Sequence, residues 1–123
     1  MKKLIKIAAA QLTPVFLNKE KTIEKACEAI SEAGKNGAEL IVFPEAFISG
    51  YPDWVWLIPN SKGKMLNDLY VRLVENAISV PDDSTDKLCK SAKAAGINVV
   101  LGMNERNTDK SGASLYNSIL FIS

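Results

Sequence analysis

The order of the first three segments constrains the fold of this chain more than any other feature. Residues 5–11 and residues 39–43 are short apolar runs, which are typical of strands buried on both faces. Between them, residues 18–36 place apolar side chains on one helical stripe and glutamates on the opposite face. Strand, helix and strand predict a βαβ unit with two parallel strands and a right-handed crossover. The apolar stripe consists of Ile23, Ala26, Cys27, Ile30 and Ala33.

The ends of the helices are marked by capping residues. Asn18 is a candidate N-cap of the first helix, and Gly34 or Gly37 is a candidate stop. A second helix is predicted over residues 62–78. The acids at 82, 83 and 86 suit the positive N-terminal end of a third helix, which runs to Gly96. The second helix is predicted to bury Leu66, Leu69, Leu73 and Ile78, and the third Leu88, Cys89, Ala92 and Ala95.

Two further strands complete the predicted fold. Residues 97–103 and 115–122 are apolar, and the polar segment 104–114 between them has the composition of a loop. We therefore predict an antiparallel pair at the end of an α/β layered architecture, in which helices cover a sheet. The last strand is followed directly by Ser123, with no helix to cover one sheet face. This favours a truncated chain, or one part of a larger protein, over a complete domain.

Length and charge exclude several classes of protein. A chain of 123 residues is long enough for one domain and too short for two. Its formal net charge of +1 does not favour binding to nucleic acid or to an anionic membrane. The apolar run after the N-terminus is broken by Lys6, so we interpret it as a strand rather than a signal peptide. We expect a cytoplasmic protein without a membrane span.

The absence of histidine removes much of the catalytic repertoire. A Ser–His–Asp triad, a Cys–His pair and a histidine-ligated zinc site cannot form within this chain. Acid–base chemistry must therefore use Glu, Asp, Lys, Tyr or Cys. Cys27 and Cys89 both fall at apolar helix positions, where buried structural thiols are common.

Glu45 is the candidate catalytic residue that the pattern itself singles out. It lies two residues beyond the predicted second strand, in the stretch IVFPEAFISGYPDW. Ligands of open α/β sheets gather beyond the carboxyl ends of the strands, so the position suits a catalytic acid or base. The alternative is a structural carboxylate that caps a turn or pairs with Arg or Lys.

Four segments resemble a known family. AAAQLTP, GAELIVFPEAFISGYP, GINVVLGMNERN and SLYNSILF are similar, in order and spacing, to the N-terminal part of the nitrilase (carbon–nitrogen hydrolase) superfamily, with most similarity to its nitrilase and cyanide-hydrolysing branch. The resemblance implies that residues 1–123 are the N-terminal portion of a single αββα sandwich domain, with no second domain. It covers essentially the whole chain.

The resemblance also implies a chemistry. Members hydrolyse nitriles or amides through a Glu–Lys–Cys site, without metal or organic cofactor, and Glu45 matches the first catalytic glutamate. The lysine and cysteine of the family lie further along and would fall beyond Ser123, so we expect this chain alone to be inactive. Glu105 does not match the second glutamate, which follows the lysine, and we assign it no catalytic role. Neither Cys27 nor Cys89 fits a nucleophile, which needs an exposed position and a lowered pKa.

Two aromatic residues after Glu45 are candidate substrate-binding residues. Tyr51 and Trp54 could wall the pocket that members of this family form beside the first glutamate. Alternatively, they and Trp56 anchor the loop to the protein or to a partner. Residues 55–74 coincide with an insertion that longer members use for subunit contacts, so we expect a homo-oligomer.

Three functions remain open at this point. The first is a nitrilase-like hydrolase that converts nitriles to carboxylic acid and ammonia, or an amidase. The second is a non-catalytic module that acts in binding or assembly. The third, an independent flavodoxin-like domain, ranks last because LTPVFLNK contains no glycine for a phosphate-binding loop.

Overall fold

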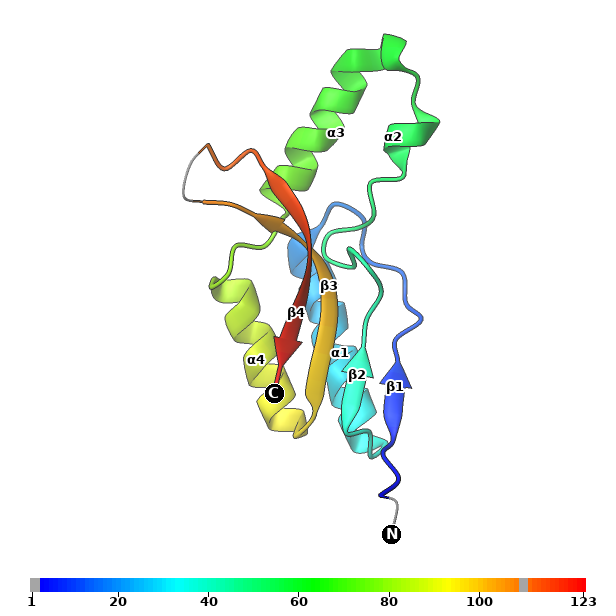
Figure 1. Ribbon diagram of the computed structural model, residues 1–123, viewed down its shortest axis with the longest axis vertical. Helices are drawn as coiled ribbons and strands as arrows, with labels where there is room; N and C mark the ends of the chain where they lie inside the picture. Colours follow the sequence, from blue (N-terminus) through cyan, green and yellow to red (C-terminus); the bar gives the residue numbers. More distant parts are fainter. Residues whose placement is uncertain (1–2, 109–110) are drawn as a thin grey trace.

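The chain folds into one four-stranded sheet with helices against one face (Figure 1). The computed structural model describes residues 3–108 and 111–123, so Asp109 and Lys110 of the predicted loop lie outside the described residues. The strands are adjacent in sequence order, and the first three run parallel while the last is antiparallel to the third. This confirms the predicted α/β layers and strand pairs. The strands are β1 Ile7–Ala9, β2 Leu40–Val42, β3 Asn98–Arg106 and β4 Leu115–Ile122.

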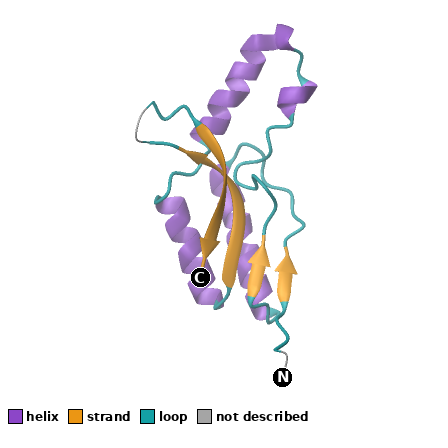
Figure 2. Cartoon of the chain, viewed as in Figure 1, coloured by secondary structure: helices purple, strands orange, loops and turns teal. Residues whose placement is uncertain are grey.

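The helices form two groups (Figure 2). Helices α1 Lys19–Lys35 and α4 Asp83–Ala95 lie side by side behind the sheet, and their apolar faces form the main core with it. Helices α2 Trp54–Leu57 and α3 Gly63–Glu75, joined by the short 3₁₀ turn η1 Asn60–Lys62, extend away from the sheet. The short elements α2 and η1 were not predicted.

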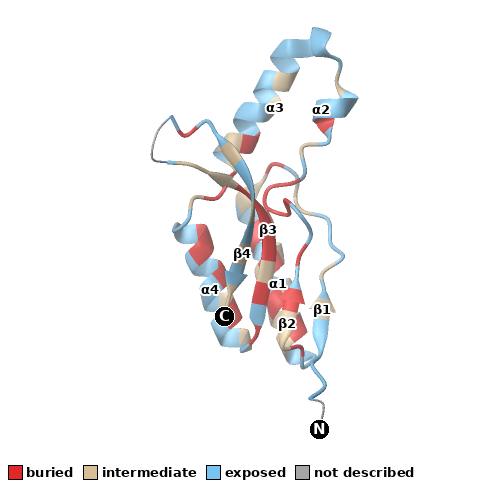
Figure 3. Cartoon of the chain, viewed as in Figure 1, coloured by how far each residue is buried: buried red, intermediate tan, exposed pale blue. Residues whose placement is uncertain are grey.

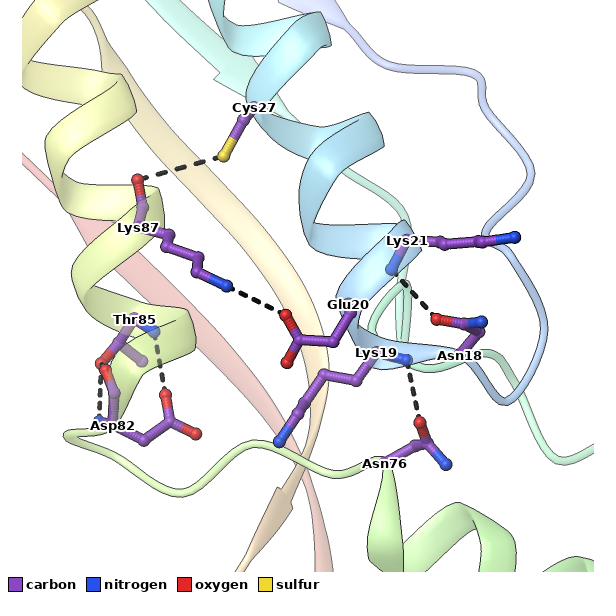
Figure 4. Close-up of polar contacts among 9 residues, drawn as sticks. All are labelled: Asn18, Lys19, Glu20, Lys21, Cys27, Asn76, Asp82, Thr85 and Lys87. Carbon is purple, nitrogen blue, oxygen red and sulfur yellow. Dashed lines mark hydrogen bonds and ion pairs between the residues drawn. The ribbon is translucent and has the colours of Figure 1, made fainter.

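Local capping explains why α1 and α4 begin where they do. The Asn18 side chain accepts a hydrogen bond from the Lys21 N–H at 3.0 Å, and Asp82 forms a reciprocal capping box with Thr85 (Figure 4). Gly96 ends α4 with a φ of +66°, a left-handed conformation that suits glycine. The predicted N-cap of α1 and the predicted ends of α4 are therefore confirmed.

Some burial predictions were wrong. Strand β1 is not buried on both faces, because Ile7 is 58% exposed. Cys89 is exposed and Cys27 only half-buried. Ile78 is buried as predicted, but it lies beyond the end of α3, where its backbone bridges to Glu105. The last strand pair extends through Arg106, which pairs with Leu115, so part of the predicted polar loop is strand.

The face of the sheet opposite α1 and α4 is uncovered by the described residues (Figure 3). It carries exposed apolar side chains on β1, β2 and β4, among them Phe121 with 74% of its surface exposed. Exposed apolar patches of this kind mark interaction surfaces. None of the described helices is long and apolar enough to cross a membrane.

Asn76, just beyond α3, ties three segments together near the carboxyl ends of the parallel strands. Its Oδ1 accepts a hydrogen bond from the Lys19 N–H at 2.9 Å, at the start of α1 (Figure 4). Its backbone carbonyl accepts a hydrogen bond from the buried Ser49 hydroxyl. Asn76 therefore links the loop that follows β2 and the start of α1 to the end of α3.

Candidate active site

Glu45 lies at the carboxyl end of the parallel strands. It follows the end of β2 by three residues, and the ladder to β3 continues up to Phe43, whose N–H donates to the Val100 carbonyl at 2.8 Å. Phe43 and Phe47 flank Glu45 in sequence and are both buried, with their ring centroids 5.2 Å apart. The loop is thus anchored by its aromatic side chains, whereas the Glu45 side chain is exposed.

Gly102, in the middle of β3, lets this loop lie directly on the strand. A Cβ atom at Gly102 would meet the Pro44 carbonyl oxygen at 2.3 Å and the Glu45 Cα at 2.8 Å. Both are backbone atoms, so they cannot move aside as a side chain would. A glycine inside a strand often marks such a close backbone approach. The position of Glu45 therefore depends on residue 102 being a glycine, which has no side chain to push the loop away from β3.

The turn after Glu45 is held in an uncommon conformation. Ala46 is buried and has a φ of +48°, in the left-handed region that residues other than glycine rarely adopt. Its carbonyl accepts a hydrogen bond from the Gly50 N–H at 3.0 Å. Strained backbone of this kind gathers at functional sites, where the surrounding structure enforces it.

The Glu45 carboxylate contacts Asn117 of β4. The Asn117 Nδ2 donates to Glu45 Oε1 at 2.5 Å. Among the described residues no Lys or Arg forms an ion pair with Glu45. Within the described residues, Glu45 is therefore not a structural carboxylate that pairs with Arg or Lys.

Asn104 of β3 fixes the far end of the same loop. It is 7% exposed, and its Nδ2 donates to the carbonyls of Ile48 at 3.2 Å and Gly50 at 3.0 Å. Its backbone N–H also donates to the Ile48 carbonyl. Because Asn104 lies directly opposite Asn117 in the antiparallel register, one strand pair holds both the loop backbone and the Glu45 carboxylate.

Replacing Asn104 with leucine is expected to destabilise the protein by about 1–3 kcal/mol, because the Gly50 carbonyl loses its buried donor. The free energy of unfolding from urea titration measures the loss. Asn98→Ala is the matched control, since the Asn98 side chain on the same strand also donates to a carbonyl but is exposed, and it should cost less than about 0.5 kcal/mol. Equal losses in the two variants would contradict a special role of Asn104.

The candidate substrate-binding aromatics lie in different environments. Tyr51 is 44% exposed and stacks on Trp56, with ring centroids 6.0 Å apart. Trp54 is 7% exposed and packs in a small cluster with Leu17 and Leu73. Its indole N–H is buried and has no hydrogen-bond partner among the described residues. Tyr51 is thus accessible to a small molecule, while Trp54 anchors α2.

The other candidate groups lie apart from Glu45 or have structural partners. Burial raises the pKa of the Cys27 thiol, and its Sγ faces the Lys87 carbonyl of α4 at 3.9 Å (Figure 4). Glu105 accepts a hydrogen bond from the Ser118 hydroxyl at 2.6 Å. In the described part of the chain, no group of three or more Cys, Asp or Glu could hold a metal ion.

Sequence reasoning missed Gly102, Asn104 and Asn117. Glycine and asparagine are rare in strands, so the presence of Gly102 and Asn117 in two predicted strands indicated that these residues do more than pack the sheet. Which partner each residue has depends on contacts far along the chain, and no local pattern identifies them.

A family model for carbon–nitrogen hydrolases matches residues 6–123. The chain belongs to this family. Named relatives agree with the assignment. The chain is 38% identical to an arylacetonitrilase of Aspergillus niger over 112 residues, which is 91% of this chain and 31% of that protein. It is 40% identical to a nitrilase of Bacillus sp. over 111 residues, covering 90% of this chain and 30% of that protein. This carbon–nitrogen hydrolase chain thus spans about a third of the length of these relatives.

Solved structures show the same fold. An amidase from Nesterenkonia sp. has a TM-score of 0.57 at 23% identity, over 81% of this chain and 32% of that one. A glutamine-dependent NAD(+) synthetase from Cytophaga hutchinsonii has a TM-score of 0.62 at 18% identity, over 98% of this chain and 17% of that one. The α/β fold of this chain is therefore shared with larger proteins.

Proposed function

We propose that residues 1–123 are the N-terminal portion of the single αββα domain of a nitrilase-type hydrolase, with Glu45 as its general base. The observation that carries the proposal is the placement of Glu45 at the carboxyl ends of parallel strands in a chain whose relatives include nitrilases and arylacetonitrilases. The catalytic lysine and cysteine would lie beyond Ser123. The remainder of the domain would cover the exposed apolar sheet face.

The proposed reaction uses no metal or organic cofactor. Glu45 takes the proton of the cysteine thiol, and the thiolate attacks the nitrile carbon to form a carbon–sulfur bond. The lysine stabilises the negative charge that develops in this step. The proton then passes from Glu45 to the nitrile nitrogen, which gives a covalent thioimidate and restores the Glu45 carboxylate. Addition of water and loss of ammonia convert the thioimidate to a thioester. A second water then releases the carboxylic acid and restores the thiol.

Tyr51 is proposed to form part of the substrate pocket. Its exposed ring is six residues from Glu45, and its stacking on Trp56 limits its movement. Trp54 is proposed to support the pocket from behind, because its buried ring holds α2 in place three residues after Tyr51. An apolar wall with few polar groups suits the organic substituent of a nitrile.

The test compares the full-length protein that carries this segment with residues 1–123 alone. Ammonia release is measured on arylacetonitriles, aliphatic nitriles and the corresponding amides. The proposal expects hydrolysis of nitriles by the full-length protein and none by the segment. Preference for amides would make the protein an amidase, and no release by the full-length protein would favour a non-catalytic binding or assembly module.

The protruding segment α2–α3 is proposed to contact a second copy of the protein. It carries apolar side chains exposed to solvent, among them Trp56 and Leu57. Exposed aromatic and aliphatic side chains of this kind are typical of interface centres. We expect a Trp56→Glu, Leu57→Glu variant of the full-length protein to have a lower mass than wild type by light scattering. A wild-type monomer at micromolar concentration would contradict the proposal.

A further inference from the structure

We infer that Asn117 is a positioning residue for Glu45, and this inference rests on the proposed function. The amide group of Asn117 holds one carboxylate oxygen of Glu45 and leaves the other free to accept the proton of the nucleophile. The observation is the Nδ2 to Oε1 hydrogen bond, which joins residues 72 positions apart in sequence.

The contact joins a loop residue to a strand. Asn117 lies within β4, and its neighbour across the sheet is Asn104, whose side chain binds the carbonyls of Ile48 and Gly50. The donor that holds Glu45 is therefore part of the strand pair that holds the loop. Functional groups are oriented best by partners on such rigid elements.

The chemistry of the donor suits a general base. The primary amide of asparagine is neutral, so it orients the carboxylate without placing a positive charge beside it. A lysine or arginine at this position would instead form an ion pair and compete for both oxygens. Glu45 Oε2 accepts no hydrogen bond from the residues that the structure describes.

The face of β4 that carries Asn117 supports this role. Residue 117 shares the uncovered sheet face with Ile119 and Phe121, whereas Ser118 points to the opposite face and binds Glu105. Asn117 is itself exposed, so no buried packing depends on it. Its polar side chain in an otherwise apolar strip is explained by its contact with Glu45.

The test uses four variants of the full-length protein, of which Glu45→Gln reports on the proposed function itself. Asn117→Leu has a similar volume but no donor, and we expect its kcat on a nitrile to fall about 100-fold with KM changed less than about 3-fold, since a misplaced catalytic group costs this much. Asn117→Gln keeps the amide group, and its kcat should be at least about tenfold higher than that of Asn117→Leu. Ser118→Ala removes the neighbouring hydrogen bond to Glu105 and should retain wild-type kcat.

The outcomes separate the inference from the proposed function. If wild type is active and Glu45→Gln is not, but Asn117→Leu has wild-type kcat, the positioning role is wrong and the function stands. Equal losses of kcat in Asn117→Leu and Asn117→Gln, with lowered thermal unfolding midpoints, would show a structural role and overturn the inference. A wild-type protein that releases no ammonia from nitriles or amides overturns both.

Discussion

Replacing Glu45 with glutamine is expected to abolish turnover by the full-length protein while leaving its fold intact. A positioned general base contributes about 10²–10⁴-fold to the rate, and a glutamine amide cannot accept the thiol proton. The glutamine carbonyl oxygen can still accept the hydrogen bond from Asn117. Because the side chain is exposed, the free energy of unfolding should change by less than about 0.5 kcal/mol. Ammonia release and urea unfolding measure the two effects.

Glu105→Gln is the matched control for this variant. Glu105 is also a carboxylate near the ends of the strands with one hydrogen-bond donor from β4, but the resemblance gives it no catalytic role. We expect the turnover of the Glu105→Gln variant to equal that of wild type. Activity retained in Glu45→Gln would remove Glu45 from the mechanism, and activity lost in both variants would point to a shared structural cause.

Replacing Gly102 with alanine is expected to reduce both stability and turnover. The new methyl group would lie 2.3 Å from the Pro44 carbonyl oxygen and 2.8 Å from the Ala46 nitrogen, so the loop must move away from β3. Overpacking of this kind costs about 1–3 kcal/mol. Displacement of Glu45 by about 1 Å would lower kcat roughly 100-fold. Thermal or urea unfolding and nitrile kinetics measure the two losses.

Gly63→Ala is the control for the intrinsic effect of this substitution. Gly63 lies at the start of α3 with helical dihedral angles, and a Cβ atom there meets no atom within 4 Å other than its chain neighbours and the backbone of its own helix. Alanine should therefore stabilise the protein, by about 0.4–1 kcal/mol. If Gly102→Ala were as stable and active as wild type, the close approach of the loop would not determine the position of Glu45.

Several errors of the sequence interpretation share one physical cause. Cys89 follows the buried Leu88 by one helix position, and such a step turns the side chain by about 100°, which places it outside the core stripe. Ile7 was expected inside because apolar runs are typical of strands covered on both faces. The burial of a particular face depends on what packs against it, and a run of residue types does not contain that information.

The sequence alone determined the order of the four strands and the three longer helices, the N-cap at Asn18, the acidic start of α4 and the location of Glu45 just beyond the second strand. These features depend on residues a few positions apart, where capping and hydrophobic periodicity act. Only the tertiary structure decided that Glu45 rests on Gly102 and binds Asn117. Those contacts join residues 57 and 72 positions apart, and their pairing follows from strand register and from the space that a missing side chain leaves.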